Sequence, residues 1–219
     1  RPVVMTTQDS SWLARLPNRS CDVLDTLAFK IALTLRYNLE WEEDKELAQI
    51  VCPNHKKASN RDSKQPSKLS LRHALGCRIN AEGKIVSRHD SIVRIVGKKL
   101  AVSGCNPRVE QPLPYEVNGQ RKVSAHRPDV WCMTDDKLQV YDVTVGSLTN
   151  TKDKESWNVS RNSKMRQYKE LNDAMGDKVQ INIIQFDVAG RVGNETENIL
   201  NKIGVTRSLI TNIQLMILS

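Results

Sequence analysis

Two aspartates in the second half of the chain have the spacing of a paired metal-binding site. Asp129 and Asp142 have twelve residues between them. They belong to β-rich runs at 126–133 and 137–145, which are joined by a turn composition at 134–136. If the runs pair as a hairpin, the carboxylates lie on neighbouring strands and converge from one face. Two convergent carboxylates bind a hard cation such as Mg²⁺ or Mn²⁺, which offsets charge on phosphoryl oxygens in phosphate-ester chemistry.

A lysine that completes such a site is expected on the following helix. Side chains alternate along a strand, so a Pro-Asp…Asp-x-Lys nuclease would carry its lysine at position 144, where this chain has Thr144. Lys164, on a helix expected over 160–175, is the natural replacement, and Tyr168 follows four residues later on the same face. The pattern also has an ordinary interpretation, because Pro-Asp is common in turns and Lys and Tyr at this spacing are common on helix surfaces.

An ordered set of short motifs resembles a known family. The motifs are HALGC at 73–77, Arg88-His89, Val109-Glu110, Arg127-Pro128-Asp129, VYDV at 140–143, and Lys164 with Tyr168. In this order and at these separations, the set resembles the restriction-enzyme-like endonuclease domain of non-LTR (LINE-type) retrotransposons, in the PD-(D/E)XK nuclease superfamily. The resemblance covers roughly residues 50–190, and the stretch at 33–39 is similar to the segment that joins reverse transcriptase to this endonuclease.

The resemblance implies a fold, an activity and a set of partners. The fold is α/β, a restriction-endonuclease-like αβββαβ core with a mixed sheet. Asp129 and Asp142 would hold Mg²⁺ or Mn²⁺, Lys164 would position or activate the attacking water, and Tyr168 would orient that group or contact the scissile phosphate. The enzyme would nick double-stranded target DNA in the nucleus to expose a 3′-hydroxyl that primes reverse transcription. Its further partners would be RNA and the reverse transcriptase domain of the same polyprotein.

Basic side chains near these motifs are candidates for contacts with DNA phosphates. The candidates are Arg88, His89, Lys98, Lys99, His126 and Arg127. Each alone has an ordinary interpretation as a solvated surface charge or a satisfied polar group. Glu110 is a third acidic candidate for the metal site.

A second metal site is expected ahead of the nuclease core. Cys52 and His55, followed by His73 and Cys77, form a Cys-x2-His pair and a His-x3-Cys pair with seventeen residues between them. Two ligand pairs with short internal spacings suit a tetrahedral structural Zn²⁺. The alternative is two unrelated thiols and two histidines satisfied by other partners. Members of the resembled family carry a Cys-Cys-His-Cys knuckle, from which the second ligand type and the spacings here depart.

Composition limits the remaining function classes. The chain has 219 residues, 33 Lys+Arg against 25 Asp+Glu, and a net charge of +8, which favours an anionic partner such as nucleic acid. Its apolar runs are far shorter than the ~20 residues that span a bilayer, so no membrane association is expected. The start at Arg1 rather than Met indicates a piece of a longer polypeptide.

The expected organisation has three parts. A helical linker segment from the polymerase side occupies 1–50, the candidate zinc knuckle with a basic loop occupies 51–85, and the nuclease core with its C-terminal helices occupies 86–219. In the core, Ser87 is expected to cap a helix that ends before Gly104 and buries one stripe. The members of this stripe are Ile92, Val93, Val96 and Leu100.

Further elements follow along the core. A strand is expected at 107–111, a hairpin-type turn at Asn118-Gly119 and a strand buried on both faces at 179–188. Short helices are expected at 195–203 and 207–218.

Two other function classes fit the same residues. The first is a catalytically inactive nucleic-acid-binding module of the same fold, in which the zinc knuckle and the lysines form a docking surface. The second is a structural linker needed only to fold the polymerase. It predicts neither DNA cleavage nor salt-sensitive DNA affinity.

Overall fold

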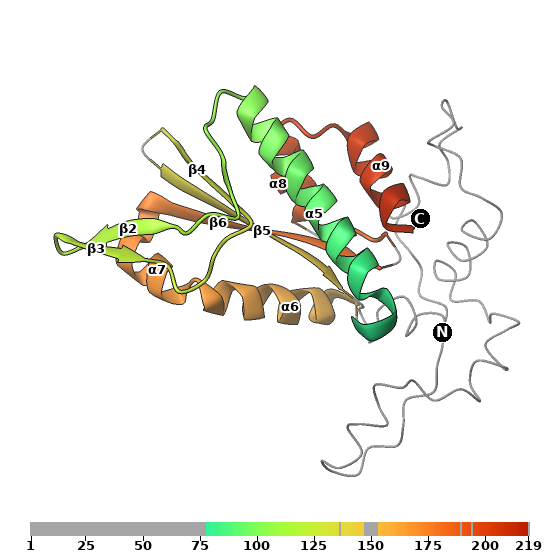
Figure 1. Ribbon diagram of the computed structural model, residues 1–219, viewed down its shortest axis with the longest axis horizontal. Helices are drawn as coiled ribbons and strands as arrows, with labels where there is room; N and C mark the ends of the chain where they lie inside the picture. The colour runs from blue at the N-terminus through green and yellow to red at the C-terminus, as the bar shows by residue number, and fades with distance from the viewer. Residues whose placement is uncertain (1–77, 136, 147–152, 189, 194, 219) are drawn as a thin grey trace, which may run out of the picture.

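The computed structural model describes residues 78–135, 137–146, 153–188, 190–193 and 195–218 (Figure 1). The expected linker segment at 1–50 and most of the candidate zinc knuckle lie outside these residues. No helix within the described ranges is long and apolar enough to cross a membrane.

A mixed sheet of four strands forms the centre of the described region, in the order β1-β4-β5-β6. The strands are β1 (Arg108–Val109), β4 (Val130–Thr134), β5 (Lys137–Gly146) and β6 (Val179–Asp187). β1, β4 and β5 pair antiparallel, whereas β5 and β6 pair parallel. The prediction of an α/β domain with a mixed sheet is therefore confirmed.

Helices cover both faces of this sheet (Figure 1). The parallel connection from β5 to β6 runs through α6 (Asp153–Gln167), α7 (Lys169–Met175) and the short 3₁₀ helix η3 (Gly176–Lys178) on one face. The other face carries α5 (Arg78–Val102), α8 (Thr196–Lys202) and α9 (Arg207–Leu218). A parallel strand pair needs such a crossover, because a tight turn reverses the chain.

The long helix α5 is held by the apolar stripe that its sequence predicts. Ile92, Val93, Val96 and Leu100 recur at helical spacing and are at most 2% exposed. They pack against the sheet together with residues of α8 and α9. Gly104 follows the helix with φ +84°, the left-handed conformation expected of a glycine at this position.

The predicted start of this helix is wrong. Ser87 lies inside α5, where its carbonyl oxygen accepts a hydrogen bond from the Ser91 hydroxyl at 2.8 Å, so it is not an N-cap. The helix begins at Arg78, within the segment assigned to the zinc knuckle. Serine is common at helix N-caps, but it also occurs inside helices, so Ser87 by itself does not mark where a helix begins.

The segment around Asn118-Gly119 forms two paired strands, whereas the sequence predicted only the turn between them. β2 (Pro114–Val117) and β3 (Gln120–Val123) form a separate antiparallel hairpin between β1 and β4. Its turn is the predicted Asn118-Gly119, with φ of 51° and 74°, and both residues adopt the positive φ that a type I′ turn requires. All four residues of β3 are exposed, so this strand lacks the alternation of buried and exposed residues that identifies strands in a sequence.

The helix expected over 160–175 is divided in two at Tyr168. This residue has φ −100° and ψ 12°, and its amide donates to the Met165 carbonyl at 3.1 Å. The sheet strands agree with expectation more closely. β6 is buried along most of its length, as a strand covered on both faces must be.

We expect the buried stripe of α5 to carry much of the stability of this region. Val96 is fully buried and Val102, on the same helix, is 83% exposed. Val96→Ala should lower the free energy of unfolding by about 2 kcal/mol, because it removes two buried methyl groups and leaves a cavity. Val102→Ala makes the same chemical change in solvent and should shift it by less than about 0.5 kcal/mol. Chemical denaturation of both variants tests this, and equal losses would contradict the assigned burial.

Candidate active site

The register of β4 and β5 places the two aspartates opposite each other. Val130 pairs with Tyr141 at the end of the ladder, so the next position on each strand is Asp129 and Asp142. Asp142 points to the face that α6 and α7 cover, because Tyr168 and Lys164 contact it from there. Asp129 directly precedes β4 and is contacted by His89 of α5.

Asp129 is anchored through one of its two carboxylate oxygens. Its Oδ2 accepts a hydrogen bond from the Val143 amide at 2.6 Å and contacts His89 Nε2 at 3.1 Å. Its backbone carbonyl accepts from the Glu110 amide at 2.8 Å, which extends the pairing of β1 with β4. Its Oδ1 accepts no hydrogen bond from any residue in the described ranges, so that oxygen can serve as a ligand.

Asp142 lies deeper and is engaged at both oxygens. It is 4% exposed, its Oδ2 accepts the Tyr168 hydroxyl at 2.6 Å, and its Oδ1 lies 2.8 Å from Lys164 Nζ. Burying a carboxylate without such partners would cost several kcal/mol. Each carboxylate oxygen has two lone-pair directions, so these contacts still leave acceptor capacity on Asp142.

Tyr168 acts as a hydrogen-bond donor from inside the core. It is 1% exposed and packs with Leu171 and Leu138. Burial, followed by the negative charge of Asp142, raises the pKa of Tyr168 above its ordinary value. The phenol therefore stays protonated and holds Asp142 in place. The roles expected for Tyr168 were to orient the Lys164 group or to contact a phosphate, whereas its hydroxyl here donates to Asp142.

His89 reaches the same site from α5. Its Nε2 faces Asp129 and its Nδ1 lies 3.1 Å from Asp90 Oδ1, so the imidazole bridges two carboxylates. The hydrogen bond to Asp129, opposed by burial and aided by the charges of both aspartates, raises the pKa of His89 to about 9. The sequence pointed to His89 as a DNA contact or as a histidine satisfied by a polar partner, and it carried no signal for Asp90 or for the Val143 amide.

The donor set fits a hard divalent cation. Mg²⁺ usually takes one or two carboxylates from the protein, and water and substrate phosphate complete its coordination shell. The site offers two carboxylates, and one of them has an oxygen without a hydrogen bond from the described residues. No group of three or more His, Cys, Asp or Glu side chains in the described ranges is arranged to hold a metal. If a metal binds, Asp129 and Asp142 are the two carboxylates that would hold Mg²⁺ or Mn²⁺, with the remaining ligands from water and substrate.

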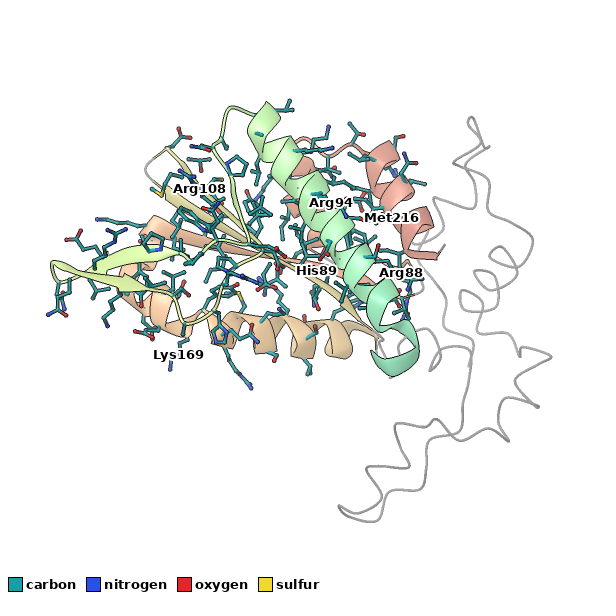
Figure 2. The ribbon with its side chains drawn as sticks, in the orientation of Figure 1. Arg88, His89, Arg94, Arg108, Lys169 and Met216 are labelled. Carbon is teal, nitrogen blue, oxygen red and sulfur yellow. The ribbon has the colours of Figure 1, made fainter. Side chains whose placement is uncertain are left out.

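The other predicted site residues are not all brought together. Arg88 and His89 extend from α5 in different directions, with His89 toward the sheet (Figure 2). Arg88 is 6% exposed, and its Nη1 has no hydrogen-bond partner among the described residues. The His126 ring lies edge-on to Tyr168 with centroids 6.4 Å apart, and Arg127 is exposed beside it.

Three predicted residues do not place a side chain in contact with the carboxylates. Lys98 and Lys99 lie about 15 Å along α5 from His89, given the rise of 1.5 Å per residue. Glu110 contacts Asp129 through its backbone amide, and its side chain is exposed. The zinc ligands proposed at Cys52, His55, His73 and Cys77 lie outside the described residues.

Comparison with known proteins gives this chain no family. A scan against protein-family models finds no model that matches it. A search of curated proteins finds no significant match either.

The buried phenol should contribute measurably to stability. Tyr168→Phe should lower the free energy of unfolding by about 1–3 kcal/mol, because it leaves a buried carboxylate oxygen without its donor. The matched control is Tyr115→Phe, whose hydroxyl donates to the more exposed Glu170 at 3.2 Å. We expect a loss of about 0.5 kcal/mol or less for the control, because water replaces the lost donor. Equal losses in denaturant titrations would contradict the assigned role of Tyr168.

The contact between His89 and Asp129 predicts a pH dependence of stability. The pKa of His89 is raised from 6.5 to about 9 in the folded chain. Its stabilisation is therefore fully present below pH 6.5 and is lost as the pH rises through about 9. The difference in unfolding free energy between the parent and His89→Gln, measured with chelator, should fall by about 1–3 kcal/mol over this range. A difference that does not change with pH would contradict the contact.

Proposed function

We propose that this chain is a metal-dependent endodeoxyribonuclease domain that nicks double-stranded DNA. One observation carries the proposal. Asp129, directly before β4, accepts a hydrogen bond from the Val143 amide next to Asp142 on β5, and Lys164 from the next helix places its amine 2.8 Å from Asp142. Paired carboxylates beside a cation are the group types that phosphodiester hydrolysis requires.

The order of elements supports a restriction-endonuclease-like core. α5, β1, β4, β5, the α6–α7 pair and β6 follow the sequence αβββαβ. The strand order and the single parallel pair at β5–β6 fit the same arrangement. The β2–β3 hairpin is then an insertion between the first two strands of the core.

Each residue of the site has a distinct task in this proposal. A bound Mg²⁺ or Mn²⁺ would supply compensation for negative charge on the phosphoryl oxygens. Asp129 and Asp142 would hold it, and Tyr168 fixes the Asp142 carboxylate. Lys164 has a side chain 30% exposed, so its amine is accessible to a phosphate or to the attacking water.

The charge of the protein supports DNA as the substrate. The net charge is +8, and the exposed His126 and Arg127 lie three and two residues before Asp129 along the chain. Cationic groups beside a cleavage site bind the phosphate backbone without reading its sequence. Following the family resemblance, we further propose that the nicked 3′-hydroxyl primes reverse transcription in the nucleus, with RNA and a reverse transcriptase domain as partners.

A plasmid assay tests the activity. The full chain, incubated with supercoiled plasmid, should produce relaxed circles with Mg²⁺ or Mn²⁺ and none with chelator. Asp129→Asn and Asp142→Asn should each reduce nicking about a hundredfold or more, because charge stabilisation worth several kcal/mol is lost. Lys164→Ala should lose most of the activity, and because it also removes the counter-charge of the buried Asp142, circular dichroism should verify that the variant is folded.

Asp173→Asn is the matched control, because it removes an exposed carboxylate of α7 that lies outside the site. It should nick like the parent. DNA affinity, measured by fluorescence anisotropy, should persist in all of these variants. Equal nicking by the parent and both site variants would refute the assignment. Salt-sensitive DNA binding with no nicking by the parent would favour the catalytically inactive binding module.

A further inference from the structure

A cavity of about 360 Å³ lies on the face of the sheet that α5 and α8 cover. It opens between the end of α5, the starts of β5 and β6, and α8. Side chains alternate along β5, so Gln139 and Tyr141 face this cavity, whereas Asp142 faces α6 and α7. The cavity is therefore separate from the carboxylate site, and its volume falls within the range of ~300–1,000 Å³ that small-molecule sites occupy.

The floor of the cavity is a closed ring of three amides. The Asn182 amide nitrogen donates to Gln139 Oε1 at 3.3 Å, the Gln139 nitrogen to Gln180 Oε1 at 3.4 Å, and the Gln180 nitrogen to Asn182 Oδ1 at 3.3 Å. Each amide has two donor hydrogens and two acceptor lone pairs. The second hydrogen of Asn182 is directed to the Val140 carbonyl at 3.2 Å. Gln139 and Gln180 thus each keep a donor and an acceptor for a ligand.

The Tyr141 hydroxyl adds a donor without a partner. Tyr141 is 5% exposed and lines the cavity, and its hydroxyl makes no hydrogen bond to any residue that the structure describes. Burial raises the pKa of Tyr141 to about 12, so the hydroxyl stays protonated at neutral pH. The hydroxyl is not sealed from solvent, so water satisfies it when no ligand is bound, and a ligand acceptor in the cavity would replace that water.

The walls and the rim have a different character from the floor. The helices contribute the apolar side chains of Leu100, Ile199 and Ile203. Lys202 stands exposed at the rim and forms no ion pair with a described residue. No acidic residue lines the cavity, so a cationic ligand finds no counter-charge there, whereas an anionic group finds Lys202.

We propose that this cavity binds a nucleotide, with the base against the amide floor and the phosphate at Lys202. A nucleobase has apolar faces and an edge of alternating donors and acceptors, which match apolar helix walls above a floor of glutamine and asparagine amides. Asparagine and glutamine amides pair with such edges through two hydrogen bonds at once. The inference goes beyond the proposed function and does not rest on it, because none of the lining residues belongs to the carboxylate site.

The test uses the full chain with chelator, which prevents a metal from recruiting nucleotide to Asp129 and Asp142. Each of the four nucleoside 5′-monophosphates is titrated by calorimetry, and the contact residues are followed by NMR. We expect at least one nucleotide to bind, with shifts at Gln139, Tyr141 and Asn182. Tyr141→Phe should weaken binding about three- to tenfold, the effect of one hydrogen bond. Lys202→Gln should weaken the monophosphate but not the matching nucleoside.

Three further variants separate the possible outcomes. Tyr115→Phe removes a hydroxyl from the opposite face of the sheet, and Asp129→Asn disables the proposed nuclease site. Both should bind nucleotide like the parent. Ile199→Trp fills the cavity from a half-buried position and should abolish binding. No binding by the parent at millimolar nucleotide overturns the proposal. Binding that Asp129→Asn removes but Tyr141→Phe leaves unchanged also overturns it.

Discussion

The hydrogen bond from the Val143 amide to Asp129 Oδ2, at 2.6 Å, is the contact on which the site depends. It lies just beyond the last paired residues of β4 and β5. There a side-chain oxygen, rather than a backbone carbonyl of β4, accepts the hydrogen bond from the β5 backbone. It therefore ties the carboxylate of one strand to the backbone of the next, and it leaves Oδ1 without a protein donor among the described residues. The Nε2 atom of His89, on α5, also contacts Oδ2 of Asp129.

The second constraint is the cost of burying Asp142. A carboxylate that is 4% exposed is tolerated only with close partners, and Lys164 and Tyr168 supply a counter-charge and a short hydrogen bond. Both partners come from one crossover connection, Lys164 from the last turn of α6 and Tyr168 from the residue between α6 and α7. The break between α6 and α7 falls at Tyr168 itself, where the phenol enters the core. Tyr168 thus belongs both to the carboxylate site and to the apolar packing between the sheet and the α6–α7 connection.

β5 serves two surfaces because its side chains alternate. Asp142 faces α6, and its neighbour Tyr141 faces the cavity beneath α5 and α8. One face presents charged groups that suit a cation and a phosphate, and the other presents amides and a hydroxyl that suit a neutral heterocycle. A substitution on β5 therefore affects one surface directly and the other only through the backbone that the two share.

Periodicity and turn chemistry in the sequence determined much of the core. The stripe of α5 and the buried strand β6 follow from local spacing, because each buries its own face, and the turn at Asn118-Gly119 follows from its residue types. Local spacing also paired Asp129 with Asp142 as candidates, since a short hairpin sets its own register. Only the tertiary structure decided that His89, forty residues earlier, meets Asp129, that Tyr168 is buried, and that three amides close into a ring. These contacts join segments distant in sequence, and no local pattern encodes the packing that brings such segments together.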